Sequence, residues 1–229
     1  MKESNLSRRE QSGNDWIIDG WIRPGETFGL FGEPKTCKSF VLLDMGLWIA
    51  CGKPWHGSAT KAGKVLYVDG SRTQTVGIRA QGWCQHNDAV RVPDHQFSVI
   101  SDFIQLESPE AVQGLTNTIE GDESVVILDL SIPFDLGDRG LAEYAASLRQ
   151  GLAKVRRAFA GALGLSVGTY GPADRASTML GLDTSMVLDA KGSSAVNIRS
   201  LSKDRGPSKQ FAMTEIKIDE DWSTLVLEG

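Results

Sequence analysis

The sequence predicts an α/β fold, with a mostly parallel sheet, helices on both faces and an antiparallel extension at its C-terminal end. Strand-like and helix-like segments alternate from Thr27 to Thr169, which is typical of parallel strands joined by crossover helices. The most apolar strand-like run, residues 124–130, belongs at the centre of the sheet, because a strand covered on both faces has no polar side. After Pro172 the segments are short and joined by tight turns, which predicts the antiparallel extension.

Each element follows from its local pattern. The first strand is predicted at Thr27–Phe31, and the helix at residues 38–50 has apolar side chains at helical spacing. Gly52 and Pro54 end this helix. The other predicted elements are strands at 64–68, 97–100, 124–130 and 163–169, helices at 78–85, 109–119 and 141–162, and late strands at 185–189, 195–201, 210–218 and 223–227.

Length and composition favour one domain over residues 16–229, preceded by a flexible polar segment, residues 1–15. With 24 basic and 29 acidic side chains the net charge is −5, so the chain lacks the broad basic surface typical of nucleic-acid-binding proteins. This balance leaves contact with DNA through a few loops open.

Cysteine usage and apolar run lengths predict a cytoplasmic protein. The three cysteines show no C-x-x-C spacing, so neither a zinc knuckle nor a redox pair is expected. Residues 1–15 do not resemble a secretory signal, and no apolar run is long enough to span a bilayer.

Residues 32–39, GEPKTCKS, follow the first strand and open the first helix. They approximate the phosphate-binding pattern G-x-x-x-x-G-K-[ST], whose backbone N–H groups bind phosphate oxygens. The sequence therefore predicts a site for ATP and Mg²⁺, with Lys38 on the β- and γ-phosphates and the Ser39 hydroxyl on the metal. The alternative is a tight turn with a surface lysine. The predicted nucleotide-binding residues are Gly32, Glu33, Pro34, Lys35, Thr36, Cys37, Lys38, Ser39 and Phe40.

Cys37 departs from this pattern, because it stands where the second glycine belongs. A small side chain is tolerated there if its Cβ points away from the phosphates. A thiol at a helix N-terminus beside a lysine is expected to have a lowered pKa and raised reactivity.

Asp129 ends the apolar run VVILD, about ninety residues after the phosphate loop. A carboxylate at the end of a buried strand beside that loop is placed to hold Mg²⁺ through a bound water. Asp129 and Ser39 are therefore the predicted metal residues. The alternative is an aspartate that caps the following turn.

By these motifs the chain resembles the RecA-like P-loop ATPases of the RepA-type replicative helicases of plasmids and phages. The fragments that carry the resemblance are GWIRPGETFGLFGEPKTCKSFVLLDMGLWIACGKPWHG, KAGKVLYVDGS, IRAQGWCQH, VVILDL and SLSKDRGP. The resemblance implies ATP hydrolysis, assembly into hexameric rings and movement along single-stranded DNA.

Two strand ends depart from that group. Ser71 stands where the resemblance places the glutamate that activates water, and Asp69 is the only nearby acid, so hydrolysis is expected to be slow or absent. The group's histidine pair is replaced by GTYGP, in which Thr169 is the candidate polar sensor of the γ-phosphate and Tyr170 is expected to pack.

The resemblance also assigns four basic residues. Lys203 and Arg205, in SKDRGP, correspond to cations that reach a neighbouring subunit's nucleotide; the alternative is a hairpin turn with solvated charges. Arg139, in the loop predicted at 131–140, and Arg175, in PADRASTML, which the resemblance makes the loop after the strand at 163–169, are the candidates for contact with DNA.

Two functions therefore stay open. One is a ring-forming ATPase motor on single-stranded DNA in replication or repair. The other is a nucleotide-binding protein that lacks hydrolysis and acts as a regulatory or structural partner, which Cys37 and Ser71 favour. The remaining aromatic and imidazole side chains are expected to pack, since they lack metal-ligand spacing: Trp48, Trp55, Trp83, His56, His86 and His95.

Overall fold

The computed structural model describes residues 16–71, 75–87, 91–134, 140–169, 171–190, 195–201, 208–219 and 222–228. The expected flexible segment at residues 1–15 lies outside these ranges. The elements follow one another as β1 (Thr27–Gly32), α1 (Lys38–Cys51), β2 (Val65–Asp69), α2 (Val76–His86), β3 (Phe97–Ser101), α3 (Pro109–Thr118), β4 (Val125–Phe134), α4 (Leu141–Arg157), β5 (Ala162–Thr169), α5 (Ala173–Leu180), β6 (Thr184–Ala190), β7 (Ala195–Ser200), β8 (Lys209–Lys217) and β9 (Ser223–Glu228).

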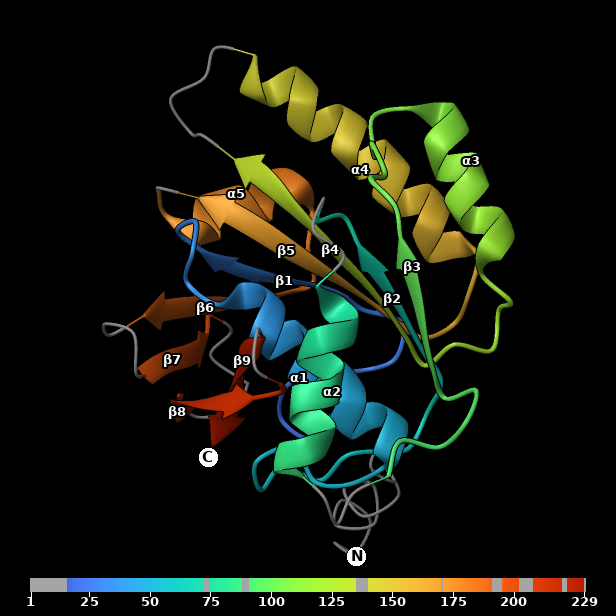
Figure 1. Cartoon of the computed structure of the whole chain (residues 1–229). Coiled ribbons are helices and arrows are strands. Elements are labelled where there is room, and N and C mark those ends of the chain that lie inside the picture. Colours follow the sequence, from blue (N-terminus) through green and yellow to red (C-terminus); the bar gives the residue numbers. More distant parts are fainter. Residues whose placement is uncertain are drawn as a thin grey trace, which may run out of the picture.

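A nine-stranded sheet runs through the described residues in the order β3-β2-β4-β5-β1-β6-β7-β8-β9 (Figure 1). The first six strands of this order pair in parallel, and β7, β8 and β9 pair antiparallel. The predicted α/β fold, with its parallel centre and its antiparallel C-terminal extension, is therefore confirmed.

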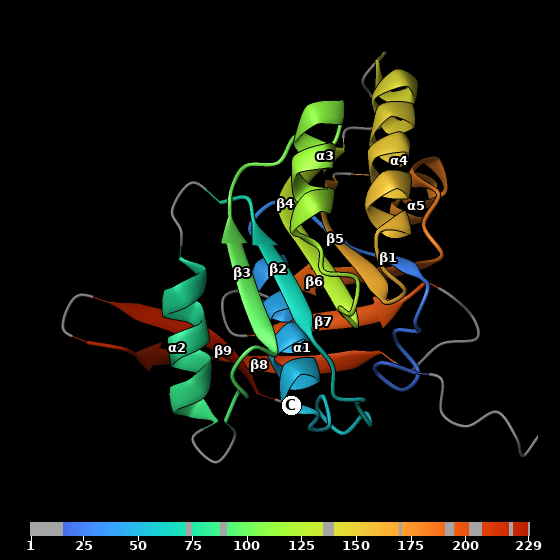
Figure 2. The same ribbon diagram turned by 90° about the vertical axis from the view of Figure 1, so that its right-hand side faces the viewer.

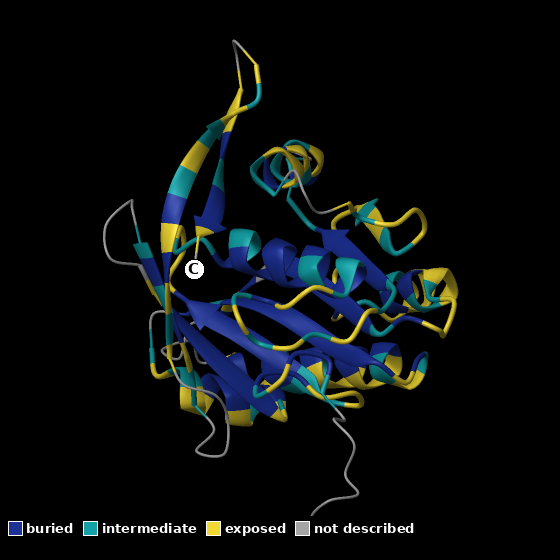
Figure 3. Ribbon diagram, turned by 90° about the horizontal axis from the view of Figure 1, so that it is seen from below, coloured by how far each residue is buried: buried dark blue, intermediate teal, exposed yellow. Residues whose placement is uncertain are grey.

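Two apolar cores lie on opposite faces of the sheet. One is built around α1 and includes Trp21, Trp55 and Trp83, while the other is built around α4 and includes Leu148 and Leu152. Figure 2 shows α1 and α2 on one side of the parallel strands and α3, α4 and α5 on the other. Seen from below, the central strands are buried along their length, and the exposed residues lie on the outer helices, on loops and on the C-terminal strands β8 and β9 (Figure 3).

The parallel strands all run toward one edge of the sheet, where their carboxyl ends meet. In open α/β sheets ligands bind in the crevice outside these carboxyl ends. The loop between β1 and α1 lies at this edge, as do the ends of β2, β4 and β5.

Most boundaries differ from the sequence prediction by a residue or two, and three differences are larger. The helix predicted at 141–162 ends at Arg157, because the chain must approach the sheet: a Cβ at Gly161 would lie 2.2 Å from the Ser124 carbonyl oxygen. The loop predicted at 131–140 begins as strand, since β4 continues to Phe134 after a bulge between residues 128 and 132. Pro133 is tolerated there because the pairing of β4 with β2 ends at Asp129, so beyond the bulge β4 pairs only with β5 among the described residues.

The third difference is α5, which the sequence prediction treated as loop. Its residues 173–180 follow Pro172, bury Ala176 and Leu180, and end at Gly181 in a left-handed conformation. These are ordinary helix signals. They were overlooked because the stretch matched a loop of the resembling group.

Candidate functional site

Residues 32–39 form a tight loop between the carboxyl end of β1 and the N-terminus of α1. Two of its non-glycine residues are left-handed: Lys35 has a φ of 68° and Cys37 a φ of 65°. Gly32 is required, because a Cβ there would lie 2.6 Å from Thr36 Oγ1 and 2.8 Å from the Leu188 carbonyl oxygen. The loop thus places backbone N–H groups at a helix N-terminus, which stabilises an anion.

Lys38 is the buried cation of this loop, with 7% of its surface exposed. Its Nζ donates to the carbonyl oxygens of Gly32 (3.0 Å) and Glu33 (2.7 Å) and to Thr36 Oγ1 (3.3 Å). Burial lowers the pKa of Lys38 because it disfavours the ammonium, while the charge of Asp129 acts in the opposite direction. Neutral loop oxygens therefore hold the ammonium at the cavity, where a phosphate can compete for it.

Asp129 lies on β4 with 4% of its surface exposed. Tyr67 Oη donates to Asp129 Oδ2 at 2.7 Å, whereas the buried Oδ1 has no hydrogen-bond partner in the described ranges. Burial, and then the neighbouring Asp129, raise the pKa of Tyr67 well above its ordinary value, so the phenol stays a donor. One carboxylate oxygen is fixed, and the other remains an acceptor for a cation or its bound water.

Asp69 lies directly beside Asp129 in the paired register of β2 and β4. It is 1% exposed, its Oδ1 accepts the Ser71 N–H at 2.9 Å, and its Oδ2 has no partner within the described part of the chain. Asp69 is the last residue of β2, and Ser71 lies beyond its end. The fold therefore places the carboxylate of Asp69 at this edge of the sheet, beside Asp129.

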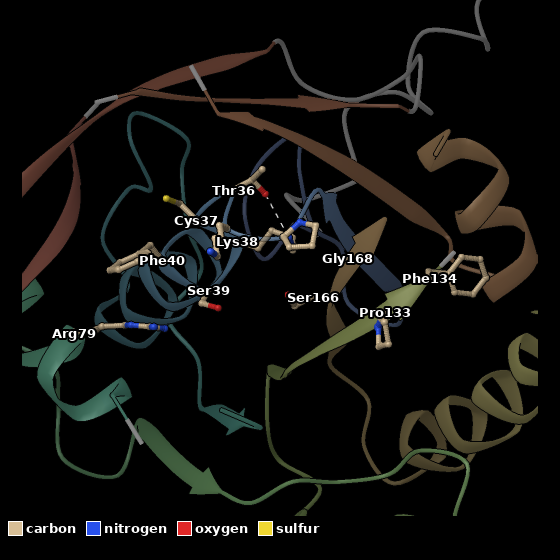
Figure 4. A pocket seen from close by; sticks show the side chains of 12 residues that line it. Thr36, Cys37, Lys38, Ser39, Phe40, Arg79, Pro133, Phe134, Ser166 and Gly168 are labelled. Atoms are coloured by element: carbon tan, nitrogen blue, oxygen red, sulfur yellow. Dashed lines mark hydrogen bonds between the residues drawn. The ribbon is translucent and has the colours of Figure 1, made fainter. Parts of the chain in front are cut away.

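A cavity of about 510 Å³ lies against the loop. One wall is formed by residues 34–40 with Arg79, and the other by Pro133, Phe134, Ser166 and Gly168 (Figure 4). Ser166 is fully buried and its hydroxyl lacks a partner among the described residues. Partnerless polar groups and a buried cation thus belong to the same sheet edge, which favours a polar, charged ligand.

Arg79 and Phe40 connect this cavity to a recess of about 250 Å³. The guanidinium carbon of Arg79 lies 4.7 Å from the centre of the Phe40 ring. The hydroxyls of Thr75 and Thr224, which line the recess, are buried without a partner in the described ranges, and Trp222 beside them is 52% exposed. The recess offers a flat cationic and aromatic wall together with two hydroxyl groups.

The expectation for Cys37 was wrong. Burial raises the pKa of its thiol, and this effect outweighs the lowering by the cations Arg79 and Lys38. In Figure 4 the sulfur points away from Ser39 and Ser166, so the side chain does not fill the middle of the cavity.

Thr169 ends β5, where its Oγ1 accepts the Gly171 N–H at 3.1 Å. It lines a different cavity, of about 800 Å³, together with Glu33 and Thr36. Arg175 is exposed in the first turns of α5, not in a loop. The structure does not bring Thr169 into the cavity of Lys38 and Ser39.

Four predicted residues lie outside the described ranges: Arg139, Tyr170, Lys203 and Arg205. Conversely, the sequence prediction gave no role to Tyr67, Arg79 and Ser166. Arg79 lies within IRAQGWCQH, a fragment that signalled the resemblance, but nothing in the pattern marked it as facing the phosphate loop. Ser166 lies in an apolar strand, and only the pairing of β5 beside β1 shows where it faces.

Within the ranges described, no group of three or more His, Cys, Asp or Glu side chains is arranged to hold a metal ion. A cation at this site would therefore rely on Asp129, Ser39 and the ligand itself, as Mg²⁺ does when it binds through phosphates. None of the helices described has the length and apolar character that crossing a membrane requires.

Known proteins resemble this chain at two levels. A family model described as an AAA domain matches residues 3–163. The crystal structure of the RadB recombinase matches with a TM-score of 0.57 and 15% sequence identity, over 84% of this chain and 89% of that chain. At this identity the likeness supports the RecA-like P-loop fold alone. No curated protein matches the sequence.

Proposed function

Since the chain belongs to the AAA-domain family, we propose that it binds ATP with Mg²⁺ against residues 32–40 and hydrolyses it. The observation that carries the proposal is that a buried cation and a buried carboxylate lie at the same edge of the sheet. Among the described residues, Lys38 is a buried cation whose hydrogen bonds go to neutral oxygens, and Asp129 nearby keeps one buried oxygen without a donor. Nucleotide phosphates with a divalent cation satisfy both groups at once.

Different residues are proposed to contact the phosphates, the Mg²⁺ ion and the base of the ligand. Loop N–H groups and Lys38 hold the phosphates, and the Ser39 hydroxyl and Asp129 hold Mg²⁺, which supplies charge neutralisation on the phosphate oxygens. The recess behind Phe40 and Arg79 receives the base, whose flat ring matches the wall they form. Its buried hydroxyls on Thr75 and Thr224 offer hydrogen bonds to the polar edge of the base.

For hydrolysis, the carboxylate of Asp69 is proposed to act as the general base that takes the proton from the attacking water. Its Oδ2 is a buried acceptor without an internal donor in the described ranges, and the register places it beside Asp129. Thr169 contributes only if its end of β5 moves toward the ligand.

The finer proposal is a ring-forming motor on single-stranded DNA in replication or repair. It is supported by the resemblance to the RepA-type helicases, including SLSKDRGP, which contains Lys203 and Arg205. Arg175, exposed on α5, and Arg139 are the proposed contacts with DNA phosphates.

A second function, nucleotide binding without turnover, has its own supporting observation. Asp69 is not free of the chain, since its Oδ1 is held by the Ser71 N–H where the resembling group has a glutamate. If this bond holds Asp69 away from the water, the nucleotide acts as a structural or switching ligand and the protein works through its partners.

The test is ATP binding and hydrolysis by the whole chain, with and without single-stranded DNA, compared between wild type and Lys38→Ala. Loss of the ammonium's bonds to phosphate is expected to cost about 3 kcal/mol, or roughly a hundredfold in affinity. Lys53→Ala, at an exposed lysine just beyond α1, is the matched control and should bind normally.

Each outcome selects one proposal. Turnover stimulated by DNA supports the motor, and tight binding without turnover supports the second function. Equal ATP affinity in Lys38→Ala and wild type would remove the nucleotide site itself.

A further inference from the structure

A buried aspartate in the middle of α1 accepts hydrogen bonds from four aromatic side chains. Asp44 is 2% exposed, and Oδ1 accepts from Trp48 Nε1 (3.1 Å) and Trp83 Nε1 (2.8 Å). Oδ2 accepts from Trp55 Nε1 (2.8 Å) and lies 2.8 Å from His56 Nε2. These five residues are called the indole clamp below.

The indole clamp is not a ligand site. An ionised carboxylate offers about four lone-pair directions, and the four donors fill them. The clamp joins three segments: α1 itself, the turn after α1 that carries Trp55 and His56, and α2, which carries Trp83. Among its three indole donors, only the one on Trp83 comes from another helix.

Trp83 and Arg79 are four residues apart on α2 and therefore lie on the same side of this helix, one turn from each other. Trp83 donates to Asp44, and Arg79 lies over Phe40 and lines both the cavity and the recess. Phe40 and Asp44 are likewise four residues apart on α1. Two neighbouring turns of α1 thus meet two neighbouring turns of α2, one through a polar contact and one through the stacked guanidinium.

We propose that the Trp83–Asp44 hydrogen bond positions Arg79 for the nucleotide, so that Trp83 and Asp44 are positioning residues of the site. The inference rests on the proposed nucleotide binding. A hydrogen bond fixes both the distance and the direction between the helices, which apolar packing alone does not. Helix α2 also packs closely on β9, where a Cβ at Gly82 would lie 2.1 Å from Thr224 Cγ2, and Thr224 lines the recess, so a shift of α2 also changes the recess.

The test compares Trp83→Phe with Trp55→Phe. Both tryptophans are buried, 3% and 0% exposed, and both donate to Asp44 at 2.8 Å, but only Trp83 belongs to α2. Trp83→Phe is expected to weaken ATP binding by roughly five- to tenfold, within the range that coupling through packed elements reaches. Trp55→Phe should leave the affinity near wild type at a comparable loss of thermal stability.

Arg79→Ala gives a second arm. If Trp83 acts through Arg79, the double variant Trp83→Phe/Arg79→Ala binds ATP no more weakly than Arg79→Ala alone. Additive losses, or equal losses in Trp83→Phe and Trp55→Phe, would overturn the proposal.

A third measurement needs no nucleotide. Trp83 fixes α2 to α1 through its hydrogen bond to Asp44, whereas Trp55 lies in the turn after α1. Amide hydrogen exchange in α2 should therefore become faster in Trp83→Phe but not in Trp55→Phe. Unchanged exchange in α2 of Trp83→Phe refutes the positioning role even if no variant binds ATP.

Discussion

Asp44 and Asp129 are both buried carboxylates, 2% and 4% exposed. Asp44, in the middle of the phosphate-loop helix, has four donors around its two oxygens. Asp129, at the edge of the sheet, has Tyr67 on one oxygen and no partner on the other within the described ranges.

The difference distinguishes a carboxylate that stabilises the fold from one that is available to bind a ligand. A buried oxygen without a donor costs about 1–3 kcal/mol, so a fold retains it where something else supplies the missing partner. In the indole clamp both oxygens of Asp44 have donors, and the clamp stabilises the packing of α1, α2 and the turn after α1. Within the described ranges the edge has several such atoms, on Asp69, Asp129 and Ser166. Ser166 lines the cavity of Lys38, and the charge of Asp129 acts on Lys38.

The largest effects should come from exchanging each aspartate for asparagine. In Asp44→Asn an amide NH₂ faces two donors, so unfolding should become easier by about 3 kcal/mol. In Asp129→Asn the Tyr67 bond can persist, and stability should change by less than about 1 kcal/mol while Mg²⁺-dependent ATP affinity falls. Urea unfolding and ATP titration with and without Mg²⁺ measure both.

The comparison fails if the two exchanges have the same effects. A strong loss of stability in Asp129→Asn would mean that its partnerless oxygen is satisfied within the folded chain. Unchanged stability in Asp44→Asn would mean that the clamp contributes no more than its apolar contacts.

The sequence predicted most of the fold because period and turn signals are local. The strands, the helix after the phosphate loop and the antiparallel extension follow from such signals, and the strand at 124–130 was correctly placed inside the sheet. The extension of β4 past its bulge was not predictable, because it depends on pairing with β5, about forty residues away. The end of α4 depends likewise on how closely Gly161 approaches residues 123–124.

For the site, residue type and spacing in the sequence predicted three of the residues to which the proposed function gives a role: Lys38, Ser39 and Asp129. It missed the role of Asp44, since an aspartate among apolar residues in a helix shows no signal until three indoles from separate segments converge on it. Arg79 and Ser166 were missed for the same reason. Trp48, Trp55 and Trp83 were correctly expected to pack, but their N–H groups were not connected to one acceptor.

The pH dependence of ATP binding tests whether Lys38 is the cation that binds the phosphates. Burial lowers the pKa of Lys38 from the ordinary 10.5, so at alkaline pH the free protein holds a neutral amine that must take up a proton to bind phosphate. ATP affinity should be constant near neutrality and should then fall, by up to about tenfold per pH unit, starting below pH 10.5.

Lys38→Arg is the control for this titration, because a guanidinium stays charged throughout that range. The variant is expected to bind more weakly at neutral pH but with a flat profile. If wild type and Lys38→Arg lose affinity in parallel, the titrating group is not Lys38.

The smallest effect concerns backbone strain in the phosphate loop. Cys37 is held at a φ of 65° and a ψ of 21°, a left-handed conformation that costs a non-glycine residue about 1–2 kcal/mol. Cys37→Gly removes this strain but also loosens the unfolded chain and deletes a half-buried thiol, so the expected net gain in stability is about 0.5 kcal/mol. Affinity for ATP should stay equal or rise, because the glycine loop keeps its shape without strain.

Thermal unfolding and ATP titration of this variant measure the balance. A loss of more than about 1 kcal/mol would show that packing of the thiol against the α1 core outweighs the strain, and that Cys37 belongs with the clamp as a structural residue.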